Sequence, residues 1–431
     1  MKKSAFIGFS LFFLGTFPSP SFGQDPLAIG SSNPEIPFGD YLSDVLNNNY
    51  ELASRKYGVN ISEAQIDVAR KFPNPNFVVG NQSADISNKH LPQQWYAGFQ
   101  GTVELGGKRS ARINLATSLA DQSRALFADF LLQLRADATI TYANSLSILL
   151  TIQRKEESLR SLQQLVDSTA IKLKFGDASE TDVTQAAIEA NLMKNDLLTS
   201  QSDLKAALLA MNQLMCRKDR GSLFYPKGNL NIQVKKYDME ELIRHALEKR
   251  PDVIAARYNK VAAGNNQKLT IADRVPNFNF EVANNFYTRS TNATGPSPSY
   301  YALTYFFGVT MPISNMYTGD LEAARHRISQ SEVDLEAAKL KAEVDVKRAY
   351  LQYQLASEQL KIYNSSILTD AEKVYKGRLY SFQRGNASLF DVLNAQRMLN
   401  SVYFTYYQDL KNYAIKVVEL QRAAGIWEIE L

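Results

Sequence analysis

The sequence predicts a mainly α-helical chain with a membrane β-barrel part, built from two copies of one helix-strand-strand-helix-helix repeat. Three observations predict this fold class. Proline is absent between Lys108 and Tyr225 and again after Pro312, which leaves room for two sets of very long helices. One motif occurs twice at a fixed spacing, and four short runs alternate between apolar and polar residues.

Composition excludes several classes of protein. The 431 residues include 48 basic and 44 acidic side chains, and a net charge of +4 gives no reason to expect a nucleic-acid partner. The single Cys216 excludes an intramolecular disulfide, and three scattered histidines leave almost no material for a metal site. No nucleophile, base and orienting partner can be assembled. We therefore expect no enzyme, no cofactor and no metal centre.

Residues 1–23 are typical of a signal peptide. Lys2 and Lys3 precede an apolar run over 5–17, which is too short to span a membrane. Ser21 and Gly23 are the small residues expected just before a cleavage site, which would follow Gly23. No cysteine lies near the cut, so a lipid anchor on the first mature residue is not expected. We expect an exported protein whose mature chain has no membrane-spanning helix.

The mature chain reads as a tandem duplication. The segments 175–186 and 384–395 share Gly, Ala, Ser, Asp, Val and a final Ala at a constant offset of 209. A second match, of 69–77 with 272–280, follows the same order along the chain. These matches predict a first repeat over 24–226 and a second repeat of the same plan over 227–431.

Each repeat is expected to open with a helix, over about 38–72 and 238–275, that ends at a proline. A long helix over 108–175 would then extend about 100 Å, at about 1.5 Å per residue. Its counterpart over 320–384 is expected to be weakest at Gly377. Further helices follow the interior glycines, so we expect a tube-like wall in which long helices alternate with stacked pairs.

The alternating runs over 76–82, 95–105, 278–286 and 301–311 are predicted strands. The three stronger runs are about 10 residues long, the length of a strand that crosses a bilayer. On the pattern alone, a soluble sheet with one buried face is equally consistent. Four strands separated by long helices leave open sheet edges, which a membrane forbids. Three chains together would supply 12 strands and could close a barrel.

The duplicated motifs at 176–186 and 385–395, the proline-ended opening helices and Met311-Pro-Ile-Ser-Asn resemble the TolC-like outer-membrane efflux proteins. The segment Glu104-Leu-Gly-Gly-Lys-Arg-Ser-Ala-Arg112 is similar to the CzcC-like members, which serve heavy-metal and related efflux systems. The resemblance implies a homotrimer with a 12-stranded barrel in the lipid of a Gram-negative outer membrane and a helical tunnel through the periplasm. It implies as partners a periplasmic adaptor (membrane fusion) protein and an inner-membrane transporter of the resistance-nodulation-division type.

The resemblance also implies site residues at the far periplasmic end. The tip turns, where an adaptor would dock, fall on Gly176, Ala178, Ser179, Gly385, Ala387 and Ser388. The gate would be lined by Asp182, Asp391, Gln185 and Asn394. Some members of the family have an acidic residue at the position of Asn394. On a three-fold axis such carboxylates would raise one another's pKa and attract cations. Plain helix capping is the alternative for both aspartates, and both roles can hold together.

The leading functional hypothesis is therefore the passive exit duct of a tripartite efflux pump for small toxic compounds or metal ions. An exit duct of a protein or peptide secretion system is the alternative within the same fold. A periplasmic coiled-coil scaffold without a pore is the third hypothesis, and the strand alternation disfavours it. Lys108, Arg109 and Arg112 are expected to be surface or lipid-facing charges rather than a catalytic set.

Overall fold

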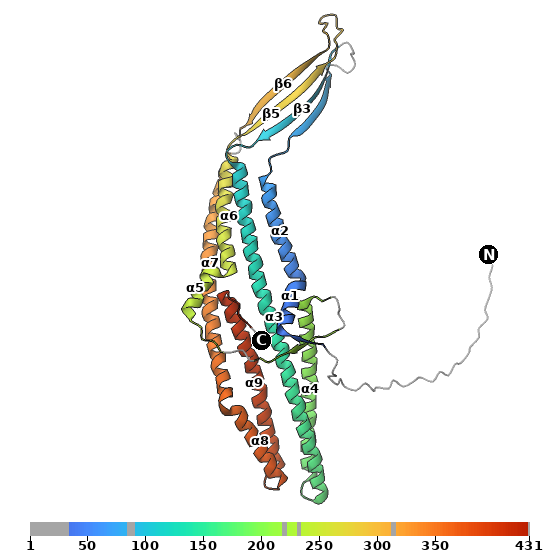
Figure 1. Cartoon of the computed structure of the whole chain (residues 1–431), viewed down its shortest axis with the longest axis vertical. Coiled ribbons are helices and arrows are strands. Elements are labelled where there is room, and N and C mark those ends of the chain that lie inside the picture. Colours follow the sequence, from blue (N-terminus) through green and yellow to red (C-terminus); the bar gives the residue numbers. More distant parts are fainter. Residues whose placement is uncertain (1–33, 84–90, 218–221, 231–233, 312–315, 430–431) are drawn as a thin grey trace, which may run out of the picture.

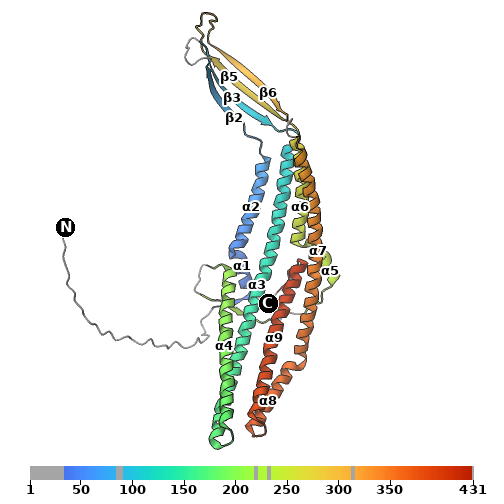
Figure 2. The ribbon, with the colours of Figure 1, turned by 180° about the vertical axis from the view of Figure 1, so that it is seen from behind.

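The computed structural model describes residues 34–83, 91–217, 222–230, 234–311 and 316–429. The predicted signal peptide lies outside these ranges. Figures 1 and 2 show an elongated molecule with a β-sheet at one end and long helices running away from it. Two helical hairpins form the opposite end, one closed by the α3–α4 turn and the other by the α8–α9 turn.

The two halves follow the same plan. The first half contains β1 (Glu35–Pro37), α1 (Phe38–Asn48), α2 (Tyr50–Arg70), β2 (Asn76–Ser83), β3 (Gln93–Val103), α3 (Lys108–Phe175) and α4 (Glu180–Met215). The second half contains β4 (Tyr225–Lys227), α5 (Met239–Lys249), α6 (Pro251–Asp273), β5 (Asn277–Tyr287), β6 (Tyr300–Thr310), α7 (Thr318–Ile362), the π-helical segment η1 (Tyr363–Ile367), α8 (Leu368–Gln383) and α9 (Leu389–Ala424). The predicted fold class, with its duplicated repeat, is confirmed.

The opening helices were expected to be single, but each is divided in two. Asn49 is extended, and its side chain accepts hydrogen bonds from the backbone N–H groups of Glu51 and Leu52, so it caps a new helix. In the second half Arg250 is extended because it precedes Pro251, which then occupies the first turn of α6. The helix interruption predicted at Gly377 is also wrong, because the chain departs from α-helical geometry earlier, at η1.

Long helices and stacked pairs build the wall. The 68-residue α3 matches its predicted range and runs from the sheet to the α3–α4 turn. Figures 1 and 2 show α2 stacked above α4 on one side of α3, and α6 stacked above α9 on the other. A buried stripe on α7, formed by Leu335, Ala342, Val346, Ala349, Tyr353, Ala356 and Leu360, faces this wall.

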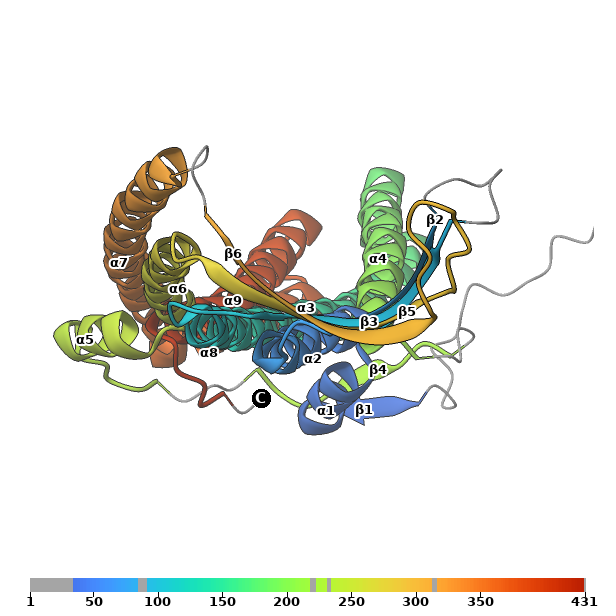
Figure 3. The ribbon, with the colours of Figure 1, turned by 90° about the horizontal axis from the view of Figure 1, so that it is seen from above.

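The sheet is antiparallel with the order β2-β3-β5-β6, which leaves β2 and β6 as open edges. Its register places Phe99 opposite Val282 and Phe280 opposite Phe307, so apolar side chains gather on one face. Thr102, Asn279 and Thr310 lie on the other face, where Thr102 donates to the Asn279 amide oxygen at 2.8 Å. Seen along the long axis in Figure 3, the strands form a curved arc.

A small second layer covers one side of the wall at mid-height. Figure 3 shows α1, α5, β1 and β4 together on that side. β1 and β4 pair in parallel, and the hydroxyl of Tyr142 on α3 accepts a hydrogen bond from the Lys227 N–H at 3.0 Å and lies 2.9 Å from the Ile36 carbonyl oxygen. Tyr142 is fully buried in the largest hydrophobic core together with Tyr41 and Tyr413. We call this core the equatorial core, and the mid-height level at which it lies the equator of the molecule.

The junction between sheet and helices is held by charged side chains. Arg112 donates to both carboxylate oxygens of Glu104, at 2.7 and 3.0 Å, and to the carbonyl oxygens of Ala69 and Lys71 at the end of α2. Lys108 is only 8% exposed and donates to the Asn277 side chain at 2.6 Å. The expectation of surface or lipid-facing charges is therefore wrong for Lys108 and for the guanidinium of Arg112.

Candidate functional site

The tip turns begin where α3 and α8 end. Gly176 and Gly385 have φ values of +83° and +80°, a left-handed conformation that favours glycine. Beyond each glycine the next N–H reaches back to a helical carbonyl, from Asp177 to Lys172 at 2.9 Å and from Asn386 to Ser381 at 2.8 Å. This bond closes the last turn of each helix and reverses the chain. Both glycines are exposed, whereas Ala178 and Ala387 are half-buried.

Each returning helix starts with a capping box. The Ser179 hydroxyl accepts from the Asp182 N–H at 3.1 Å, and the Asp182 carboxylate accepts from the Ser179 N–H at 2.9 Å. Ser388 and Asp391 repeat these bonds at 3.2 and 3.1 Å. Hydrogen bonds from the serine hydroxyl, and then from its backbone N–H, lower the pKa of both aspartates. In the structure both aspartates act as caps, and their role in lining a gate remains a prediction.

We expect Ser179→Ala to weaken the start of α4 by about 0.5–2 kcal/mol, because a donor of the first turn loses its partner. Hydrogen exchange of the Asp182 amide should become roughly twofold to thirtyfold faster, the factor to which that free energy corresponds. The pKa of Asp182 lies below its ordinary value, so the contribution of its carboxylate is complete above about pH 4 and is lost as the pH falls through the lowered pKa. Thr181→Ala, in the same turn but outside the box, is the control, and equal rates in both variants would contradict the role of the cap.

The structure brings the two tips together, but through residues that the sequence did not single out. Arg397 on α9 donates twice to the Glu189 carboxylate on α4, at 2.9 and 2.6 Å. The ammonium of Lys172 on α3 donates to the Phe382 carbonyl at 2.6 Å and lies 4.1 Å from the centre of its ring. Below these contacts, Asp182 and Asp391 are each bonded within their own turn. Gln185 is half-buried and Asn394 is exposed.

A separate apolar core fills the tip. It contains Leu162, Leu165, Ala186, Ala190, Met193, Phe382, Leu389, Val392 and Leu393. A polar layer divides this core from the equatorial one. Within that layer the buried Gln396 and Asn400 side chains on α9 both donate to the Ser158 hydroxyl on α3, at 3.1 and 2.8 Å. Because each buried amide has a partner, the layer fixes the register of α9 on α3.

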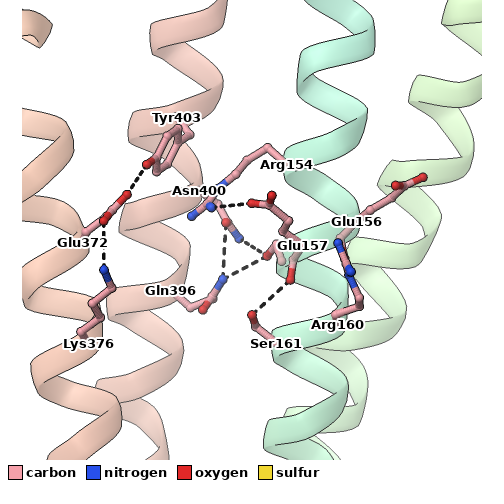
Figure 4. A network of polar contacts seen from close by, with 11 residues as sticks. Arg154, Glu156, Glu157, Arg160, Ser161, Glu372, Lys376, Gln396, Asn400 and Tyr403 are labelled. Atoms are coloured by element: carbon pink, nitrogen blue, oxygen red, sulfur yellow. Dashed lines mark hydrogen bonds and ion pairs between the residues drawn. The ribbon is translucent and has the colours of Figure 1, made fainter.

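Charged groups continue the polar layer toward α8, as Figure 4 shows. The Arg154 guanidinium lies 4.0 Å from the centre of the Tyr403 ring, and the Tyr403 hydroxyl donates to Glu372. Glu372 also accepts from Lys376 at 3.1 Å. The hydrogen bond from Tyr403 lowers the pKa of Glu372, while burial and the neighbouring carboxylate raise the pKa of Tyr403 to about 12. The layer therefore joins α3, α8 and α9 just above the tips.

A one-sided apolar sheet, continued by a helical wall that ends in two capped hairpins, is the architecture of outer-membrane channels with a periplasmic helical extension. A sequence model of the family described as outer membrane efflux protein matches residues 41–217 and 242–426. The chain therefore belongs to the outer membrane efflux protein family. The expected outer-membrane location and the absence of an enzymatic role are confirmed by this membership.

Two curated relatives are similar over most of their length. The cobalt-zinc-cadmium resistance protein CzcC of Cupriavidus metallidurans is 22% identical over 365 residues, which cover 85% of this chain and 84% of CzcC. The outer membrane efflux protein BepC of Brucella suis is 22% identical over 402 residues, covering 89% of this chain and 84% of BepC. Both alignments extend through the two halves of the chain.

Solved structures share the fold. CusC superposes with a TM-score of 0.75 at 17% identity, covering 94% of this chain and 96% of CusC. The open state of the Neisseria gonorrhoeae MtrE outer membrane channel gives a TM-score of 0.74 at 17% identity and covers 90% and 89% of the two chains.

Two further findings concern the described part of the chain alone. None of its helices combines the length and the apolar character that crossing a membrane requires. No group of three or more His, Cys, Asp or Glu side chains within it is arranged to hold a metal ion.

Proposed function

We propose that the protein is the passive exit duct of a tripartite efflux pump, and that three copies form one channel. The observation that carries this proposal is the sheet, which has one apolar face, one polar face and two open edges. Four strands cannot close, since membrane barrels need about 8 or more, whereas three sheets joined edge to edge supply 12.

The polar face of the sheet suits a water-filled lumen. Hydrogen bonds run across the strands from Thr102 to Asn279 at 2.8 Å and from Asn279 to Thr310 at 2.9 Å. A second set joins Gln94 to Asn285 at 2.8 Å and Asn285 to Thr304 at 2.6 Å. The opposite face carries exposed aromatic and aliphatic side chains such as Phe77, Phe99, Tyr305 and Phe307, which suit lipid.

The helical wall also has surfaces that fit a second copy. On α7 an exposed apolar stripe recurs at intervals of 7 and 4 residues, on the side opposite its buried stripe, through Val333, Leu340, Val344, Leu351, Leu355 and Ile362. On α2 the exposed Tyr50, Tyr57, Ile61 and Val68 have the same spacing. Figure 1 shows α7 and α2 at opposite edges of the wall, so the α7 of one copy would meet the α2 of the next.

The partners and the cargo follow from the same assignment. The tips formed by Gly176–Ser179 and Gly385–Ser388 would meet a periplasmic adaptor, and an inner-membrane transporter of the resistance-nodulation-division type would supply the energy. Similarity to a cobalt-zinc-cadmium resistance protein favours divalent metal ions as cargo, with small toxic compounds as the broader class.

The test combines conductance with cell sensitivity. The purified protein should form a trimer that conducts ions across a planar bilayer, and a strain without it should become more sensitive to cobalt, zinc or cadmium. Leu351→Glu charges the α7 stripe and should abolish the trimer, whereas Gln352→Glu, about 100° around α7 from Leu351, should leave it intact. No conductance from an intact trimer would overturn the channel, and unchanged sensitivity to metals and drugs would favour protein secretion instead.

A further inference from the structure

A cavity of about 550 Å³ lies in the helical wall at the point where α9 ends and α6 begins. Side chains of α3, α6, α7 and α9, together with Arg250, form its walls. Its volume falls within the range of about 300–1,000 Å³ that is usual for small-molecule sites. Two of its lining residues, Ala349 and Ala423, belong to the equatorial core, so the cavity lies at the height of that core and not at the tips.

The position of the cavity on α7 shows which side of the wall it opens to. Lys341, Asp345, Arg348 and Gln352 line it at intervals of 4, 3 and 4 residues, so they share one helix face. Tyr350 donates to the Tyr237 carbonyl at 3.3 Å, toward the α5 side. At 3.6 residues per turn, the cavity face lies roughly 180° around α7 from Tyr350. The cavity therefore opens on the side away from α1, α5, β1 and β4 (Figure 3).

The charges in the cavity do not balance pair by pair. Arg250 binds both Asp252 and Asp345 at 2.9 Å, and Lys416 binds Glu419 at 2.8 Å. Three further cations line the cavity, namely Lys341, Arg348 and Arg422. Within the described part of the chain, no carboxylate forms an ion pair with any of these three. Because Arg250 pairs with two aspartates and Asp129 lies outside the pairs, the lining as a whole holds five cations and four carboxylates, a net charge of +1.

The chemistry of the three unpaired cations selects a class of ligand. Arginine presents a planar fork of donors that matches the oxygen atoms of phosphate and carboxylate groups, and lysine adds a point charge. The first turn of α6 offers little to an anion, because Pro251 has no N–H and the Val253 N–H donates to Asp252 at 2.8 Å. An anion would therefore be held by side chains from α7 and α9.

We propose that this cavity binds a small oxyanion carrying two or more negative charges, on the lumen side of the tunnel wall. The lumen assignment rests on the proposed function, whereas the binding site itself rests on the three unpaired cations. In a trimer, three such cavities would lie at one height. The channel would then offer a cationic ring at its equator, well above the acidic residues of its tips.

The probe is sodium tripolyphosphate, titrated calorimetrically into the purified full-length protein in detergent, with sodium chloride of equal ionic strength in the reference titration. The native protein should bind the probe at one site per chain. The triple variant Lys341→Ala, Arg348→Ala, Arg422→Ala should lose at least tenfold in affinity. A matched control removes three cations that pair with neighbours on their own helices, through Lys339→Ala, Lys347→Ala and Lys376→Ala.

The control triple should bind as the native protein does. Absence of binding by the native protein, or an equal loss in both triples, would overturn the cavity assignment. If the cavity triple fails to give a heat-resistant trimer, the single variants Arg348→Gln and Arg422→Gln replace it, and each should lose at least threefold. Conductance in potassium chloride tests the channel function separately. A protein that conducts ions but does not bind tripolyphosphate would therefore contradict the proposed anion site and leave the proposed channel function standing.

Discussion

Phe307→Lys should prevent the protein from assembling in the outer membrane, whereas Phe306→Lys should be tolerated. The two phenylalanines are neighbours on β6 and are equally exposed in a single chain, at 63% and 61%. Phe307 lies on the apolar face, where its ring stacks on Phe278 with centroids 5.8 Å apart. A lysine facing lipid costs up to about 2–4 kcal/mol at the bilayer midplane, and a trimer contains three copies.

Phe306 lies on the polar face, opposite Glu281 in the register, so a lysine there would meet water and a carboxylate. The measurement is the amount of heat-resistant trimer in purified outer membranes, at matched expression of both variants. Equal loss in the two variants would show that the faces are assigned wrongly.

Arg112→Ala should lower the stability of the folded protein by about 3 kcal/mol, since breaking a half-buried ion pair leaves the partner charge without compensation. Glu104 is 11% exposed and receives two hydrogen bonds from Arg112, while the carbonyl oxygens of Ala69 and Lys71 receive one each. The variant should therefore loosen the end of α2 as well as the joint below β3. Urea unfolding in detergent, followed by circular dichroism, measures the loss.

Arg124→Ala is the control for this prediction, because Arg124 pairs with the carboxylates of Glu63 and Asp121 but is 49% exposed. Exposed pairs contribute about 0–1 kcal/mol. The double variant Glu104→Leu, Arg112→Leu should recover part of the loss, since it removes the uncompensated charge. If Arg112→Ala is no worse than Arg124→Ala, the junction is not held in the way described.

Most of the fold could be predicted from the sequence because its signals are local and repeated. The bounds of α3 follow from a glycine pair before Lys108 and a glycine after Phe175. The divisions at Asn49 and Arg250 were missed, although Pro251 is visible in the sequence, because the apolar spacing continues across both positions. The break at η1 carries no proline or glycine, so helix propensity placed it wrongly at Gly377.

The functional residues were harder to predict, for a physical reason. The caps at Ser179 and Ser388 depend on residues three positions away, so a motif reveals them. The Glu189–Arg397 pair and the Ser158–Asn400 contact join positions more than 200 residues apart, and only the packing of α3, α4 and α9 creates them. The equatorial cavity likewise draws its charges from four helices, none of which is unusual in isolation.

The duplication also has a mechanical consequence. The tip hairpin of the first half is connected to the sheet by α3, a continuous helix of 68 residues. The tip hairpin of the second half is connected to the sheet by α7 and α8, which are interrupted by the π-helical segment η1. A π-helical segment widens the backbone ladder and bends more easily than the α-helix around it. Three copies would therefore end in six hairpins, of which a stiff kind and a more flexible kind alternate around the axis. Under a force along the long axis, the hairpins on α3 would keep their position, whereas those beyond η1 would bend.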